Sequence, residues 1–115
     1  MTKEEYIRKV VEEKGEDWVV AAMVEGSIGY HTPHHARRLI RDYLGGRKRD
    51  ACERCLCCYG GNLEEMIWHD IKAFEYVEEK MPQKARKLIE VIKEWEKLDS
   101  VDATAVGLMY PTMMV

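Results

Sequence analysis

Two long apolar stripes with helical spacing, separated by one proline, constrain the fold of this chain more than any other feature. The first stripe begins after Asn62, which has capping-box spacing to Glu65, and Pro82 suits the first position of the second helix. A turn this short predicts that helices over 62–81 and 82–98 lie antiparallel with their stripes in contact. The stripe residues are Leu63, Met66, Ile67, Ile71, Phe74 and Val77, followed by Ala85, Leu88, Ile89, Ile92, Trp95 and Leu98.

Two helices are predicted near the beginning of the chain. Thr2 and Glu5 have capping-box spacing and open a helix over 3–14. Between Asp17 and Glu25, residues 18–24 are apolar all round, a pattern that a buried helix shares with a buried strand. A possible cap at Asp17 and two alanines favour the helix.

A third helix is predicted to start at Pro33, behind the N-cap Thr32, and to end at Leu44 before two glycines. Its spacing gives it two different faces. The apolar face, which we expect in the core, consists of Ala36, Leu39, Ile40 and Tyr43, and the opposite ridge consists of His34, Arg37, Arg38 and Arg41.

These patterns predict an all-α protein, a compact bundle of five to six helices with an apolar C-terminal tail. At 115 residues the chain has the size of one domain, 1–115, and its 46% hydrophobic and 34% charged residues fit neither a membrane protein nor a disordered one. It contains no apolar run of about eighteen residues and does not start with a secretory signal, so we expect a cytoplasmic protein without membrane contact. The single Asn and single Gln resemble the composition of thermophilic proteins.

The tail, residues 101–115, is apolar without helical period. An exposed apolar tail is unfavourable in water, so it either folds back over the core or forms a homodimer contact with a second subunit.

Four cysteines within seven residues form the motif that most needs a chemical explanation. They are predicted to lie on a short helix over 51–59, because Asp50 and Glu53 have capping-box spacing and two glycines follow. Disulfides between such near positions would restrain little, so a disulfide would join the helix to another segment or subunit. In the alternative without any chemical role, some of the thiols are small buried apolar groups. The four are Cys52, Cys55, Cys57 and Cys58.

Zinc binding is one interpretation of this cluster. Cys52 and Cys55 have the spacing of a zinc half-site, and a histidine could complete a tetrahedral set from His31, His34, His35 and His69. The preferred ligands are Cys52, Cys55, Cys57, His34 and His35.

Thiol redox chemistry is a second interpretation. Cys52 would lie in the first turn of the short helix, where the helix dipole and nearby arginines favour a thiolate, and Cys55 lies one turn further on. The two residues would then act as nucleophile and resolving thiol of a catalytic pair, the arrangement that dithiol oxidoreductases have at a helix start.

A basic segment offers a third function, the binding of nucleic acid. Residues 31–54 carry a net charge of +4, whereas the whole chain carries −3. No phosphate loop or DNA-reading motif accompanies the charge. The candidate residues are Arg37, Arg38, Arg41, Arg47, Lys48 and Arg49.

The sequence thus leaves three functions open. The first is a small cytoplasmic accessory or binding protein whose cysteine cluster holds zinc or forms a structural or redox-active disulfide. The second is a nucleic-acid-binding regulator, and the third is a thiol oxidoreductase. Neither the substrate nor the pathway follows from the residues.

Overall fold

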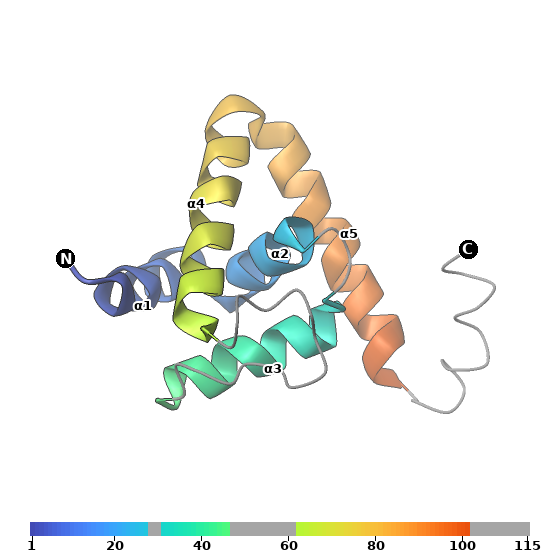
Figure 1. Ribbon diagram of the computed structural model, residues 1–115. Helices are drawn as coiled ribbons and strands as arrows, with labels where there is room; N and C mark the ends of the chain where they lie inside the picture. The colour runs from blue at the N-terminus through green and yellow to red at the C-terminus, as the bar shows by residue number, and fades with distance from the viewer. Residues whose placement is uncertain (28–30, 47–61, 102–115) are drawn as a thin grey trace.

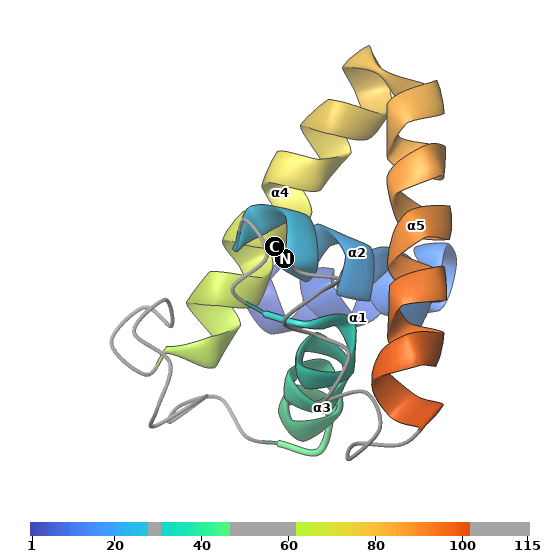
Figure 2. The same cartoon turned by 90° about the vertical axis from the view of Figure 1, so that its right-hand side faces the viewer.

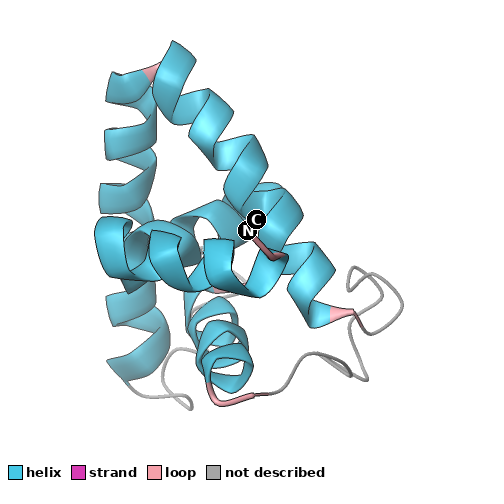
Figure 3. Cartoon of the chain, turned by 90° about the vertical axis from the view of Figure 1, so that its left-hand side faces the viewer, coloured by secondary structure: helices cyan, strands magenta, loops and turns pink. Residues whose placement is uncertain are grey.

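The computed structural model describes residues 1–27, 31–46 and 62–101, with the side chains of 99–101 excluded. Its five helices are α1 (Lys3–Lys14), α2 (Glu16–Gly26), α3 (Pro33–Leu44), α4 (Leu63–Lys80) and α5 (Pro82–Val101). Helix accounts for nearly all of the described chain (Figure 3). The predicted all-α bundle is therefore confirmed, whereas the short helix expected over 51–59 and the tail over 102–115 lie outside the described residues.

Local signals in the sequence set the beginnings of α1, α3 and α4, whereas the expected cap at Asp17 is wrong, because α2 begins one residue earlier, after Gly15, without a side-chain cap. The Thr2 hydroxyl accepts from the Glu5 amide and the Glu5 carboxylate accepts from the Thr2 amide, which is a complete capping box. The side chains of Thr32 and Asn62 accept in the same way from the amides three residues further on. Each cap satisfies an amide that the first turn of its helix leaves without a partner.

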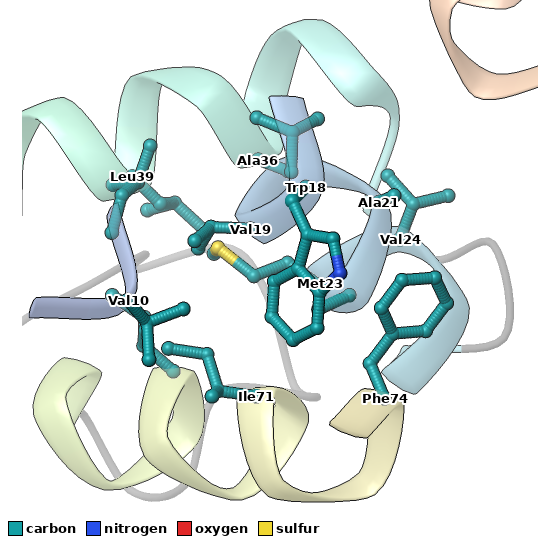
Figure 4. Close-up of a cluster of buried hydrophobic side chains, with 14 of the residues drawn as sticks. Val10, Trp18, Val19, Ala21, Met23, Val24, Ala36, Leu39, Ile71 and Phe74 are labelled. Atoms are coloured by element: carbon teal, nitrogen blue, oxygen red, sulfur yellow. The ribbon is translucent and has the colours of Figure 1, made fainter. Parts of the chain in front are cut away.

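The α2 helix lies at the centre of the bundle, between α3 on one side and α4 on the other (Figures 1 and 2). Its residues 18–24 are all buried, which explains why the sequence has no polar face there. Figure 4 shows Met23 between the side chains of the neighbouring helices, and Trp18 meets Phe74 edge-on at a ring-centre distance of 5.1 Å.

The α4 and α5 helices form a hairpin whose closed end extends beyond the other helices (Figure 1). The two helices diverge from this end and contact α2 as well as each other, so the expected antiparallel pair is splayed. The expected core face of α3 is also confirmed, because all four of its apolar residues are buried. Within the described part of the chain, no helix is long and apolar enough to cross a membrane.

Candidate functional site

Most of the cysteine and basic residues singled out from the sequence fall outside the described chain. Cys52, Cys55, Cys57 and Cys58 lie in the segment 47–61, and so do Arg47, Lys48 and Arg49. The zinc, disulfide, redox and nucleic-acid roles of these residues therefore stay predictions. The described part of the candidate site consists of the histidines and arginines around the beginning of α3.

The chain between α2 and α3 brings two histidine rings together. Ser27 ends α2 with its hydroxyl donating to the Val24 carbonyl, and the same oxygen accepts from the His31 amide at 3.0 Å. Thr32 then caps α3 by accepting from the His35 amide. These bonds fix the backbone at Ser27 and from His31 into α3, and the rings of His31 and His35 lie with their centres 5.2 Å apart.

Burial makes this histidine pair neutral at physiological pH. The His31 side chain is 1% exposed, and burial, with a smaller contribution from the charge of His35, lowers the pKa of His31 to about 4. Burial also lowers the pKa of His35, and the charges of Arg38 and His34 add to that effect. A neutral imidazole has one lone pair that can bind a metal ion, which a protonated ring lacks. In His35 this lone pair, on Nδ1, accepts from the Arg38 guanidinium at 3.1 Å, so that contact would have to open for His35 to bind a metal ion.

The distance between the two rings fits a shared metal ion. Two imidazoles bound to one tetrahedral zinc, at Zn–N distances of about 2.0–2.1 Å, place their ring centres roughly 5 Å apart. Within residues 1–27, 31–46 and 62–101, no three His, Cys, Asp or Glu side chains are grouped closely enough to hold a metal ion. His31 and His35 alone do not make a metal site, so a metal ion here would need further ligands from outside the described residues.

The structure pairs His35 with His31 and leaves His34, the other predicted imidazole ligand, on the exposed side of α3. His69 lies on α4, where its Nε2 is 2.9 Å from a carboxylate oxygen of Glu65 one turn earlier. It therefore has the hydrogen-bonded, partly exposed setting expected from its position outside the apolar stripe.

The arginine ridge of α3 is engaged by acidic residues of two other helices. Arg37 is only 17% exposed and donates to Glu16 and Asp17 of α2 and to both carboxylate oxygens of Glu96 on α5, at 2.5–2.7 Å. The hydrogen bonds that Arg37 donates to Glu96 raise the pKa of its guanidinium most, and those it donates to Asp17 and Glu16 raise it further, against the opposing effect of burial. Arg37 therefore links three helices.

The other two arginines of the ridge are more open to solvent. Arg41 is 67% exposed and reaches Glu16 at 3.0 Å, and the Arg38 guanidinium lies 3.1 Å from His35 Nδ1. Beside Arg37 lies a surface hollow of about 280 Å³, which is lined by acidic and basic side chains. Its lining residues are Asp17, Arg37, Lys93, Glu96 and Lys97.

Comparison with known proteins adds no family to this geometry. No protein-family model matches the chain, and no curated protein or solved structure matches it. The site is therefore interpreted from its own residues.

Sequence reasoning missed one buried charged residue. Asp70 lies on the core face of α4 with 8% of its surface exposed, and burial raises the pKa of its carboxyl to about 7. It contacts Gly26 at the end of α2 so closely that a Cβ on that glycine would overlap its carboxyl group. The only signal for Asp70 is its helical spacing from Met66, Ile67 and Phe74, which places it within the apolar stripe.

Proposed function

We propose that this protein is a small helical zinc-binding protein in which His31 and His35 supply two nitrogen ligands and the cysteine cluster supplies thiolates. One observation carries the proposal, namely the neutral imidazoles of the buried His31 and the partly buried His35, held 5.2 Å apart between ring centres. Four thiols are available in the same chain, and the mixed cysteine and histidine set is one that structural zinc sites use. Cys52 and Cys55, with their zinc half-site spacing, are the preferred thiolates.

The surroundings of the two histidines support a structural role for the ion. The hydroxyls of Ser27 and Thr32 already orient the backbone of both histidines, so metal binding would cost little further ordering there. An ion held by His31, His35 and two thiolates would fasten the 47–61 segment to the beginning of α3. In a reducing cytoplasm, the compartment we propose for this chain, the thiols would stay available as ligands.

Nucleic-acid binding receives less support from the described arginines. Arg37 already has carboxylate partners from α2 and α5, and Arg41 has one from α2. A phosphate would have to displace these carboxylates, so the binding would rest mainly on Arg38 and on the undescribed Arg47, Lys48 and Arg49. We therefore rank nucleic-acid binding below zinc binding, and the thiol oxidoreductase below both, because no described residue adds to it.

Metal analysis of single-residue variants tests the proposal. The unaltered chain, purified under reducing conditions and without an affinity tag, should contain close to one zinc per chain by elemental analysis. Cobalt(II) in its place should give the visible spectrum of a tetrahedral site together with a thiolate charge-transfer band.

Matched histidine variants identify the nitrogen ligands. His35→Gln should lose most of the zinc, whereas His34→Gln, one position away on the exposed side of the same helix, should keep it. A folded, metal-free protein with four free thiols would overturn the zinc proposal. So would zinc that both variants retain equally, because the ligands would then be other residues.

A further inference from the structure

The outer side of α5 carries an apolar stripe that the bundle leaves partly uncovered. Val91 is 53% exposed, and Met81 and Leu98 are each 43% exposed, although most apolar side chains of the described residues are buried. Leu88 and Trp95, between them, are only partly buried. Figure 2 shows α5 running along one side of the molecule. The exposed fractions of Met81, Val91 and Leu98 leave this stripe accessible to another molecule.

The spacing of this stripe is that of a coiled-coil seam. Positions 81, 84, 88, 91, 95 and 98 alternate steps of three and four residues, and five of them are apolar. Ala85 and Ile92, which point into the bundle, lie on one flank of the seam and are 1% and 5% exposed. Lys87 and Glu94 lie on the other flank and are exposed.

The flanking charges select an antiparallel arrangement of two such helices. In a parallel pair, Lys87 and Glu94 would face the flank that holds Ala85 and Ile92, two uncharged side chains. In an antiparallel pair the outer flanks face each other, so Lys87 of one chain meets Glu94 of the other, twice in each dimer. Lys87 has no carboxylate partner among the described residues, and Glu94 contacts only Lys97 on its own helix there.

The same alignment also matches the seam residues. With the two-fold axis between positions 88 and 91, Leu88 meets Val91 of the second copy and Met81 meets Leu98. The one charged seam residue, Lys84, then lies against Trp95, where a cation–π contact is favourable. Each of the three exposed apolar side chains of the stripe becomes covered.

We propose that α5 is the interface of an antiparallel homodimer, built from the seam Met81, Lys84, Leu88, Val91, Trp95 and Leu98 and aligned by Lys87–Glu94 pairs between the chains. This inference is independent of the zinc proposal, because α5 contributes no residue to the histidine pair. It places the contact between subunits on the described surface of α5, whereas the sequence analysis offered the apolar tail as a homodimer contact.

Charge reversal with mutual rescue tests this arrangement by sedimentation velocity over a range of protein concentrations. The unaltered chain should pass from monomer to dimer as its concentration rises. Lys87→Glu and Glu94→Lys should each raise the dimer dissociation constant about tenfold, since two attractive pairs become repulsive in each dimer. An equimolar mixture of the two variants should dimerise like the unaltered chain, because every pair between unlike chains is again attractive.

Control variants separate this interface from a general charge effect. Arg86→Glu and Glu90→Lys make the same charge changes at exposed α5 positions away from the seam, and they should leave the dissociation constant unchanged. Val91→Asp should abolish the dimer without unfolding the chain, which circular dichroism would check. A monomer at every concentration would overturn the proposal, as would a dimer that the charge reversals do not weaken or the mixture does not restore.

Discussion

The carboxyl group of Asp70 on α4 occupies the space that a side chain on Gly26 of α2 would need. A Cβ atom on Gly26 would lie 2.2 Å from Asp70 Oδ1 and 2.6 Å from its Cγ, far inside normal contact distances. Gly26 therefore permits the close approach of the two helices at the point where a carboxyl group is buried between them. This relationship leads to predictions about both residues.

Substitution of Gly26 should destabilise the fold through this overlap. Gly26→Ala should lower the free energy of unfolding by about 1–3 kcal/mol, because the carboxyl group or the helix must move. The additional substitution Asp70→Ala should reduce this cost, since the remaining Asp70 Cβ would lie 3.2 Å away. Gly45→Ala is the matched control, because its nearest contacts lie at 3.4 Å or more and it should change stability little. Equal losses for the two glycines in urea denaturation would contradict the explanation.

Asp70 should make the protein less stable as the pH rises. Burial raises the pKa of its carboxyl from the ordinary value of 3.8 to about 7, so the folded state holds this proton more tightly than the unfolded state does. The contribution is fully present below pH 3.8 and is lost as the pH rises to about 7, which amounts to roughly 4 kcal/mol. Asp70→Asn should remove this dependence from urea denaturation measured at several pH values. The exposed control Glu90→Gln should retain it.

His31 should act in the opposite direction over nearly the same pH range. Burial lowers the pKa of the His31 imidazole from 6.5 to about 4, so its contribution is present above pH 6.5 and is lost as the pH falls to about 4. The unaltered chain should therefore show a shallow profile in which the two residues partly cancel. Asp70→Asn should expose a fall in stability toward acid pH, and His31→Phe should expose a fall toward neutral pH. Parallel profiles for the two variants would show that one of these assignments is wrong.

The helices of this protein were predictable because their signals are local. A capping box at Thr2 and Glu5, a proline behind Thr32 and the period of the stripe after Asn62 each act within one or two turns. The all-apolar segment 18–24 was harder to interpret, because periodicity vanishes when every face is buried. Its central position between α3 and α4 is a tertiary fact that no local pattern contains.

The candidate site was less predictable because it depends on residues far apart in the sequence. Helical spacing correctly placed Arg37 opposite the core face of α3, but no spacing rule connects it with Glu16, Asp17 and Glu96. The chemical interest of His31 likewise comes from its burial beside His35, where its amide donates to the Ser27 hydroxyl. The cysteines, whose spacing gave the strongest chemical signal, lie outside the described residues, so their role stays a prediction.

Arg37 should be a major contributor to stability through its links between helices. Arg37→Ala would leave the carboxylates of Glu16, Asp17 and Glu96 close together without their shared cation, and we expect a loss of about 2–4 kcal/mol in the free energy of unfolding. Arg37→Lys should recover only part of this loss, because an ammonium group cannot match the forked contact with both oxygens of Glu96.

The exposed neighbour Arg38 provides the comparison that separates this structural role from a ligand-binding one. Arg38→Ala removes the same charge from the next position of α3, yet it breaks no ion pair among the described residues, so it should change stability by less than about 0.5 kcal/mol. If Arg37→Ala were as stable as Arg38→Ala in urea denaturation, the acidic contacts of Arg37 would contribute little. The guanidinium would then be as available to an anionic ligand as the sequence first suggested.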